Sequence, residues 1–269
     1  MLDYLSFSQY KTYTSCPRSH YLSKVVQAED RQTWYIPIGT AVHDMVEYHL
    51  DPRHPDSPDA ESFFYPLIEK QMLIEPDLSK WMAGGPEAAP IKEEKALQRV
   101  QECFEKAVQE LDDIDVWEVE YDASGRLPGL DVPIKAYVDL IGEHKEKGPV
   151  ILDWKTGSTK PDNFQLITYA ALLKVGQFNP SRPLQYKGRY AMLAPGSPNT
   201  RYVDLSDVSP AEIGAKYQKV YEQMQAKIYK AQAGFNCRFC YHQDNCLVNA
   251  GITPRSSYYD RSAEDGYPF

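Results

Sequence analysis

Long apolar runs are missing from this sequence. No stretch approaches the roughly 18 to 20 apolar residues that a membrane-spanning helix needs, which argues against an integral helical membrane protein. The first four residues (MLDY) also lack the basic and apolar segments of a secretory signal. We therefore expect a cytoplasmic protein without a membrane partner, whose thiols stay reduced rather than forming disulfides.

The sequence has fewer basic than acidic residues. The chain has 29 Lys and Arg against 38 Asp and Glu, which gives a net charge of -9 and an isoelectric point near 5.2. Proteins that coat nucleic acids by bulk attraction are usually basic, so the composition argues against that class. A local basic groove can still bind DNA, and carboxylates that hold a metal add negative charge that the metal offsets.

Internal repeats are also absent, which argues against solenoids and propellers. A chain of 269 residues can bury a large core without disulfides, and 42% hydrophobic with 25% charged residues is ordinary for a globular domain. We expect a single domain over residues 1–250 and a flexible, polar C-terminal tail over residues 251–269.

Turn signals and periodicity predict alternating helices and strands. Residues 51–58 (DPRHPDSP) indicate an exposed loop, and residues 84–90 are typical of a mobile flap. A capping box at residues 209–212 (SPAE) opens a helix that is expected to run to Gly234. The other helices are expected over residues 6–24 (in two pieces, broken at Cys16-Pro17), 39–50, 91–111 and 163–174, and the strands over residues 116–121, 134–142, 150–155, 184–193 and 201–205.

The strands over residues 134–142 and 150–155 form an expected hairpin that carries two acids and a lysine. Asp153 and Lys155 are two residues apart, so both side chains project from one face of their strand. On the other arm, Asp139 is expected to meet Asp153 across the strand pair. Asp139 is left on that face because the opposite face is lined by Ile134, Ala136, Val138 and Leu140.

The string Asp-x-Lys is short and common, so these residues could simply be acids at strand ends. However, Asp153 lies in the apolar run VILDW, where an unpaired carboxylate is costly to bury. Adjacent carboxylates repel each other unless a cation joins them, and hard oxygen ligands suit Mg or Mn. The pattern therefore favours a divalent metal site.

Two more pairs of polar residues are spaced four apart on expected helices. His43 and Glu47 share one helix face, and Gln165 and Tyr169 share another directly after the hairpin. A lone helix histidine is often structural, and polar helix faces are common. Neither pair identifies a site by itself.

Together these motifs resemble the RecB-like branch of the PD-(D/E)xK nuclease superfamily. That pattern has a glycine-preceded helix histidine, an aspartate closing one strand, a D-x-K on the next strand and a following helix with Q-x-x-x-Y. All occur here in this order, at Gly39 and His43, Asp139, Asp153 and Lys155, and Gln165 and Tyr169. Glu120 also occupies a position where the family often carries an acid.

The resemblance implies an α/β fold with a restriction-endonuclease-like core, a mixed central sheet flanked by helices. It implies a metal-dependent DNA exonuclease that acts on single strands or DNA ends in repair, recombination, phage DNA metabolism or CRISPR adaptation, with proteins of recombination or CRISPR adaptation as partners. The implied site has Mg or Mn held by His43, Asp139, Asp153 and the backbone carbonyl of Trp154, with Lys155 assisting catalysis and Gln165 and Tyr169 positioning the substrate.

Three of the five cysteines, Cys237, Cys240 and Cys246, form C-x-x-C-x5-C, a compact ligand spacing. The expected fourth ligand is Cys16, which precedes a proline between two helix pieces. Cys103 lies in an amphipathic helix, which indicates a core residue instead. Four cysteinates can hold zinc or a 4Fe-4S cluster, and His242 could replace one ligand in a zinc site.

An N-terminal cysteine, the nuclease motifs and then C-x-x-C-x5-C are similar to the iron-sulfur subgroup of RecB-like nucleases, which includes AddB-type nuclease domains and CRISPR-associated exonucleases. This resemblance implies a 4Fe-4S cluster, with zinc as the less favoured occupant, in a subdomain built from about residues 1–25 and 230–250. A cluster that links these two segments closes a long loop of chain and so lowers the conformational entropy of the unfolded state. Two rival hypotheses are a non-catalytic DNA-binding or assembly subunit and an electron-transfer protein.

Overall fold

The computed structural model describes residues 2–28, 32–81, 93–157, 161–178, 185–234, 237, 240–242, 245 and 246. The expected flap at residues 84–90 and the expected tail at residues 251–269 lie outside these residues. No helix in the described ranges is both long enough and apolar enough to cross a membrane.

Five strands form a mixed sheet in the order β2-β4-β5-β6-β7. β4 and β5 are antiparallel neighbours, so the expected hairpin is confirmed. β5 and β6 are parallel, and the crossover that a parallel pair requires is helix α6 (Phe164–Val175). The strands are β2 (Ile114–Asp122), β4 (Tyr137–His144), β5 (Gly148–Lys155), β6 (Lys187–Met192) and β7 (Val203–Asp204).

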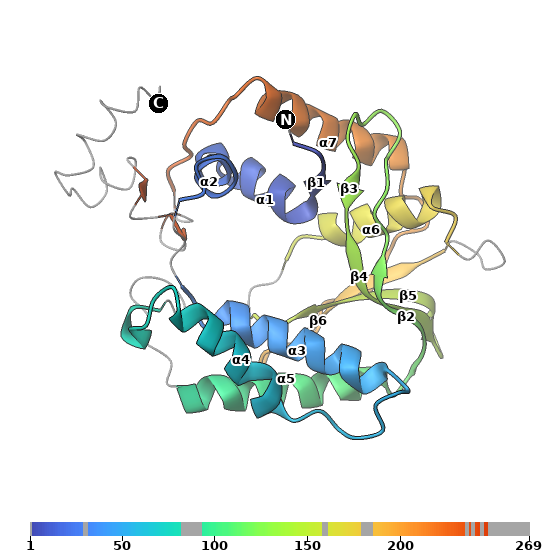
Figure 1. The fold of residues 1–269 in the computed structure, drawn as a ribbon. Coiled ribbons are helices and arrows are strands. Elements are labelled where there is room, and N and C mark those ends of the chain that lie inside the picture. Colours follow the sequence, from blue (N-terminus) through green and yellow to red (C-terminus); the bar gives the residue numbers. More distant parts are fainter. Residues whose placement is uncertain are drawn as a thin grey trace.

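Three helices cover one face of this sheet (Figure 1): α3 (Tyr35–Leu50), α4 (Ala60–Met72) and α5 (Glu93–Leu111). Buried side chains of these helices pack against Leu152 and Trp154 of β5. The sequence pattern did not predict α4 or the short 3-10 helix η2 (Leu78–Lys80). Pro66 inside α4 explains the omission, because a proline is normally taken to end a helix.

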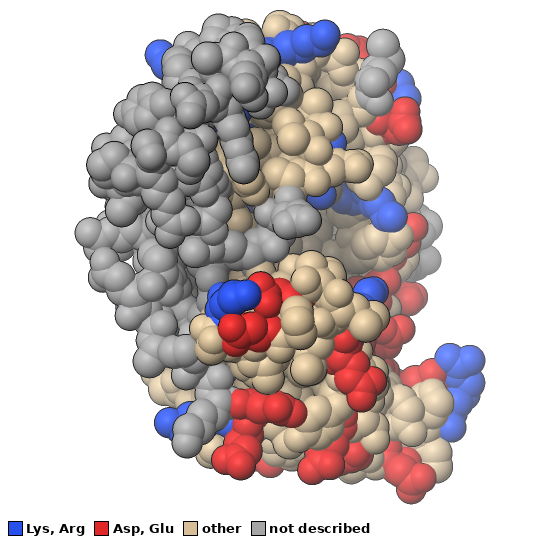
Figure 2. Space-filling view, turned by 60° about the vertical axis from the view of Figure 1, so that its left-hand side comes forward, with Lys and Arg blue, Asp and Glu red and all other residues tan. Residues whose placement is uncertain are grey.

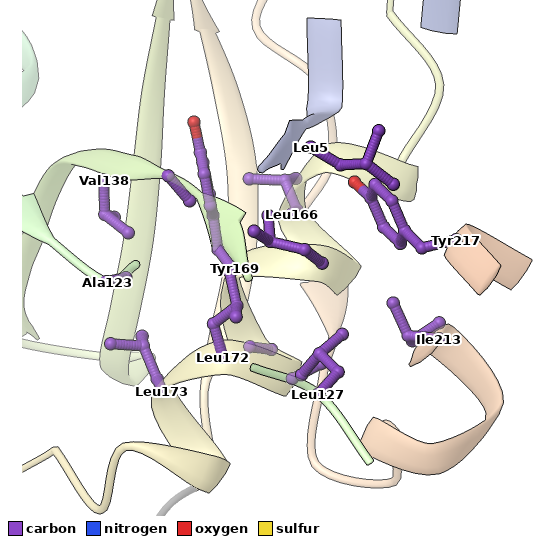
Figure 3. Close-up of a cluster of buried hydrophobic side chains, with 14 of the residues drawn as sticks. Leu5, Ala123, Leu127, Val138, Leu166, Tyr169, Leu172, Leu173, Ile213 and Tyr217 are labelled. Carbon is purple, nitrogen blue, oxygen red and sulfur yellow. The ribbon is translucent and has the colours of Figure 1, made fainter. Parts of the chain in front are cut away.

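The opposite face of the sheet is covered by α6, α7 (Pro210–Gln225) and the N-terminal helix α1 (Phe7–Ser15). Figure 3 shows Leu166 and Leu172 of α6 gathered with Ile213 and Tyr217 of α7. The sheet therefore separates two apolar cores, and the mixed α/β architecture expected from the sequence is confirmed.

The N-terminal segment is tied down by short elements. β1 (Leu5–Ser6) pairs in parallel with β3 (Ile134–Lys135), just before β4. The helical break expected at Cys16-Pro17 is confirmed, because α1 is followed by α2 (Pro17–Tyr21) and a π-helical turn, η1 (Leu22–Val26). Pro17 occupies the first position of α2, where its missing N–H costs no hydrogen bond.

The prediction that the last helix runs to Gly234 is wrong, since α7 ends at Gln225. Lys227 adopts a left-handed φ of 56°. Its N–H donates to the carbonyl of Met224, and the next N–H donates to that of Gln223, so a Schellman motif closes the helix without glycine. Beyond it, the carbonyl of Ile228 accepts a hydrogen bond from the hydroxyl of Tyr13, which ties the chain to α1.

Candidate active site

Two buried aspartates meet where β4 and β5 lie side by side. Leu140 pairs with Leu152, so one step further along the antiparallel register Asp139 lies opposite Asp153. Oδ2 of Asp139 accepts a hydrogen bond from the backbone N–H of Trp154 at 2.7 Å. The aspartates are only 7% and 1% exposed, so two carboxylates share a site from which water is largely excluded.

The prediction that successive side chains of β4 alternate between the two faces of the sheet is wrong around Asp139. Val138 packs in the core beside α6, whereas Leu140 packs with α3, α4 and α5 on the other face. The neighbouring strand shows why. Glu120 lies opposite Asp139 between two flanking pairs of the β2–β4 register and has a left-handed φ of 48°, so the backbone of β2 is not regularly extended there, although the register shift of this strand pair lies between Val116 and Glu118. Two-residue periodicity does not survive such an irregularity, although Asp139 still reaches Asp153.

His43 of α3 joins these carboxylates. Its Nδ1 lies 3.6 Å from Oε1 of Glu120 and 3.7 Å from Oδ1 of Asp139. These three residues offer ligand atoms that all lie within 4.8 Å of one another. The first half of α3 lies against the end of β5, since a Cβ at Gly39, one turn before the histidine, would lie 3.4 Å from Oγ1 of Thr156.

Lys155 and the Gln165–Tyr169 pair surround the second aspartate. Lys155 is ion-paired with Oδ2 of Asp153, an atom that receives no hydrogen bond of good geometry from the described part of the chain. Oδ1 accepts a hydrogen bond at 3.2 Å from the hydroxyl of Tyr169, which itself accepts one at 2.7 Å from Nε2 of Gln165. Figure 3 shows the ring of Tyr169 rising from α6 past Leu166.

The resemblance implied that Gln165 and Tyr169 position the substrate, which stays a prediction; in the structure Tyr169 contacts Asp153, and Gln165 contacts Tyr169. Tyr169 is buried, and its hydroxyl is used on Asp153. It is therefore placed to orient that carboxylate, with Gln165 holding the hydroxyl in turn.

Electrostatics in this cluster favour a bound cation. Burial and the neighbouring Asp153 carboxylate raise the pKa of Asp139 to about 7, against the opposing effects of His43 and Lys155. Burial lowers the pKa of His43, but the carboxylates of Asp139, Glu120 and Asp153 together raise it to about 9. The cluster therefore gathers protons near neutral pH, and a divalent ion is the other way to neutralise it.

The residues fit such an ion well. Carboxylate oxygens and one imidazole suit Mg or Mn. The backbone supplies a further oxygen, because the N–H and C=O of one strand residue point toward the same neighbouring strand. Since the N–H of Trp154 points at Asp139, its carbonyl points to that side as well. An open pocket of about 480 Å³, lined by His43, Glu47 and Glu120 among others, reaches the cluster from outside.

Glu120 is the member of the cluster that spacing alone did not identify. It lies on β2, apart from the hairpin motifs, and only the resemblance pointed to it. Glu120→Gln is expected to weaken Mn²⁺ binding by about 10-fold to 100-fold, because the neutral amide no longer orients His43 or attracts the cation. Isothermal titration calorimetry measures this. The matched control is Glu118→Gln on the same strand, and equal losses in both variants would contradict a specific role for Glu120.

Without metal, the stability of the protein should fall as pH rises. The pKa of Asp139 is raised above its value in an unfolded chain, so the folded state holds the extra proton and its stabilising effect is lost through pH of about 7. His43 acts in the same direction up to pH of about 9. In EDTA we expect a slope of up to about 1.4 kcal/mol per pH unit for each proton.

Urea unfolding between pH of about 5 and 8 measures this slope. Saturating Mn²⁺ should flatten it, because metal ligands are bound without protons. Asp139→Asn should flatten it in EDTA too. A metal-free stability that increases over this interval would show that the carboxylates do not repel each other in the folded protein.

The cysteines predicted as ligands lie where the described C-terminal segment passes the start of α2. Sγ of Cys16 accepts a hydrogen bond at 3.4 Å from the backbone N–H of Gln232. The thiol of Cys240 donates to Oγ of Ser19 at 3.9 Å. The C-terminal segment therefore runs beside the start of α2, as a shared site requires.

The remaining cysteines complete this picture. Burial raises the pKa of Cys240 against the hydrogen bonds with His242 and Ser19 that lower it, and the charges of Cys246 and Cys16 raise it further. Sγ of Cys237 accepts a hydrogen bond from the N–H of Gly234 at 3.4 Å. Cys103 instead is buried in the core beside α3, as predicted, where burial raises its pKa to about 11.

Comparison with known proteins finds a family model and distant solved structures. A solved structure from Eubacterium rectale named "Putative exonuclease" is 14% identical, with 89% of this chain and 88% of that chain covered and a TM-score of 0.48. The solved structure of SSO0001 is 14% identical, with 90% and 95% covered and a TM-score of 0.33. No curated protein matches the sequence. A model of the PD-(D/E)XK nuclease superfamily matches residues 4–247, and the chain belongs to that superfamily.

Proposed function

We propose that this chain is a RecB-like, metal-dependent DNA exonuclease that hydrolyses phosphodiester bonds in single-stranded DNA or at DNA ends. The observation that supports this most strongly is the convergence of Asp139, Asp153 and Lys155 with His43 from a distant helix. A superfamily member that had lost catalysis would have no need to keep two carboxylates buried against each other.

Each residue has a role in the proposed reaction. Asp139, Asp153, His43 and the carbonyl of Trp154 would hold Mg or Mn. When bound, the ion polarises the scissile phosphate and lowers the pKa of a water ligand. Lys155 would orient the attacking water or neutralise charge on the phosphate oxygens. Tyr169 and Gln165 would keep Asp153 in place, and Gln165, which is half-buried, is the one of the two with surface left for substrate.

The test is digestion of end-labelled and circular DNA in Mg²⁺ or Mn²⁺. We expect mononucleotides or short products from linear single strands, no cleavage in EDTA, and intact circles. Cleaved circles would reassign the enzyme as an endonuclease. Full binding of DNA without any hydrolysis would instead favour the non-catalytic DNA-binding subunit.

We also propose that Cys16, Cys237, Cys240 and Cys246 bind a 4Fe-4S cluster. Support comes from the contacts of the C-terminal segment with residues 16–19 and from backbone N–H groups that donate to two of the sulfurs. The cluster would join residues 1–25 and 230–250 into a subdomain of a single nuclease domain. Anaerobic purification is expected to give a brown protein with bound iron, and a colourless protein with bound zinc would contradict this assignment.

The resemblance to the iron-sulfur subgroup carries the biological proposal. We propose that the enzyme acts in the cytoplasm, in DNA repair, recombination, phage DNA metabolism or CRISPR adaptation, with DNA as its principal partner. Recovery of DNA-processing proteins after crosslinking in cells tests this placement, and capture of none of them would count against it.

A further inference from the structure

Charge is unevenly divided between the two helical layers. Figure 2 shows acidic side chains gathered over the lower half of the molecule, where α3, α4 and α5 lie in Figure 1. By contrast, residues 4–28 contain Lys11, Arg18 and Lys24 but no Asp or Glu. The net charge of -9 therefore does not describe the layer that contains α1. The acidic side chains of α5 are Glu93, Glu94, Glu102, Glu105 and Glu110.

A groove of about 490 Å³ opens in this less acidic layer, between α1, α7 and the start of α6. α1 and α7 contact each other along one side of it (Figure 1). Lys216 and Lys219, both exposed, line the groove from one face of α7, and Tyr10, Thr14 and Phe164 line it from the other elements.

The lysines of this groove are free for an anionic ligand. None of the ion pairs in the described ranges involves Lys216 or Lys219. Nζ of Lys216 instead lies 5.4 Å from the ring centroid of Phe164. A nucleotide has an anionic phosphate and a flat base, so a lysine without an ion-pair partner beside an aromatic ring can contact both parts.

Aromatic rings form the floor of the groove. The ring centroids of Tyr10 and Phe164 are 4.7 Å apart, and Phe164 stacks on Tyr217 with an interplanar angle of 24°. Tyr10 and Phe164 are only half-buried, so part of each ring remains accessible. The carboxylate of Asp162 is near this floor, since its charge raises the pKa of both Tyr10 and Tyr217.

The groove is connected to the carboxylate cluster through the first turn of α6. Phe164 precedes Gln165, which bonds Tyr169 one helical turn later, and Tyr169 bonds Asp153. Phe164 of the groove and Tyr169 of the cluster are five residues apart, a rise of about 7.5 Å along α6.

We infer that this groove binds the single strand of DNA leading to the site, with Lys216 and Lys219 on phosphates and Tyr10 and Phe164 against bases. The inference rests on the proposed nuclease function and names the path of its substrate. A duplex is disfavoured, because its bases are already stacked on each other and cannot cover the rings.

The test compares the double variant K216E/K219E with K70E/K95E, which makes the same charge change on exposed lysines of α4 and α5. Fluorescence anisotropy in EDTA measures binding of an oligothymidine of about 12 nucleotides. Loss of two phosphate contacts should reduce the salt dependence of log K by about 1.4 and weaken binding roughly 25-fold at 0.1 M salt. Phe164→Leu should weaken binding without changing the salt dependence.

Hydrolysis in Mn²⁺ tests whether the groove leads to the site. A thymidine dinucleotide makes fewer phosphate contacts than the oligothymidine, so K216E/K219E should lower kcat/KM less for the dinucleotide, whereas K70E/K95E should leave both values unchanged. Equal binding losses in the two double variants, or none in K216E/K219E, would overturn the inference, as would a duplex that binds as tightly as the single strand. If the wild type hydrolyses neither substrate, the nuclease proposal fails while the binding comparison still decides the groove.

Discussion

Asp153→Asn should abolish DNA hydrolysis and at the same time stabilise the metal-free protein. Hydrolysis should fall by at least about 10³-fold, because the amide neither holds a divalent cation as a carboxylate does nor neutralises its charge. The asparagine is nearly isosteric, and its oxygen can still accept the hydrogen bond of Tyr169. Removing one of two buried like charges should raise the free energy of unfolding in EDTA by about 1 to 2 kcal/mol.

The two effects have opposite signs: DNA hydrolysis should fall while the free energy of unfolding should rise. A loss of activity caused by misfolding would be accompanied by lower stability, so thermal unfolding in EDTA distinguishes the two causes. The control is Asp115→Asn, the same change on an exposed residue of β2, which should alter neither quantity. Normal cleavage by Asp153→Asn would falsify the metal site, and an inactive but destabilised variant would refute the repulsion between Asp139 and Asp153.

Cys240→Ser should lose iron and most of the attachment between the two chain ends. A link from Cys16 to Cys240 closes a loop of more than two hundred residues, for which chain entropy alone gives on the order of 5 kcal/mol. Serine binds iron poorly, so the variant should purify with little visible absorption and unfold at a lower temperature under anaerobic conditions.

Cys103→Ala is the matched control, because Cys103 is buried in the apolar core that α3, α4 and α5 form against the sheet. It should keep its iron and visible absorption, and lose only the packing of one sulfur atom. Iron that remains at wild-type levels in Cys240→Ser would refute the ligand assignment. A wild-type protein that binds zinc instead would preserve the four-cysteine site but not the cluster.

The cost of the proposed chemistry is visible in the fold. Asp139 and Asp153 occupy positions between two apolar cores where hydrophobic residues would be more stable. Activity and stability therefore pull in opposite directions at this point of the sheet, as is common where charged groups are buried for catalysis.

Short-range features could be predicted from the sequence. The hairpin, the α6 helix and the helical break at Cys16-Pro17 follow from turn chemistry and periodicity over a few residues. Asp153 and Lys155 belong to this class, because two residues on a regular strand share a face whatever the rest of the chain does.

Features that depend on contacts between distant segments could not be predicted from the sequence in this way. The end of α7 depends on a left-handed Lys227 and on a hydrogen bond from Tyr13 more than two hundred residues earlier. Glu120 belongs to the site because the register of β2 and β4 sets it opposite Asp139, where its φ is left-handed. The uneven division of charge appears only when the helices are assigned to layers.

The sequence by itself determined which chemical groups this protein carries and which neighbours along the chain share a face. Only the tertiary structure decided that His43, Glu120, Asp139 and Asp153 meet, and that Tyr169 bonds an aspartate rather than facing outward. The physical reason is that local geometry repeats every two or 3.6 residues, whereas contacts between distant segments depend on how whole layers pack.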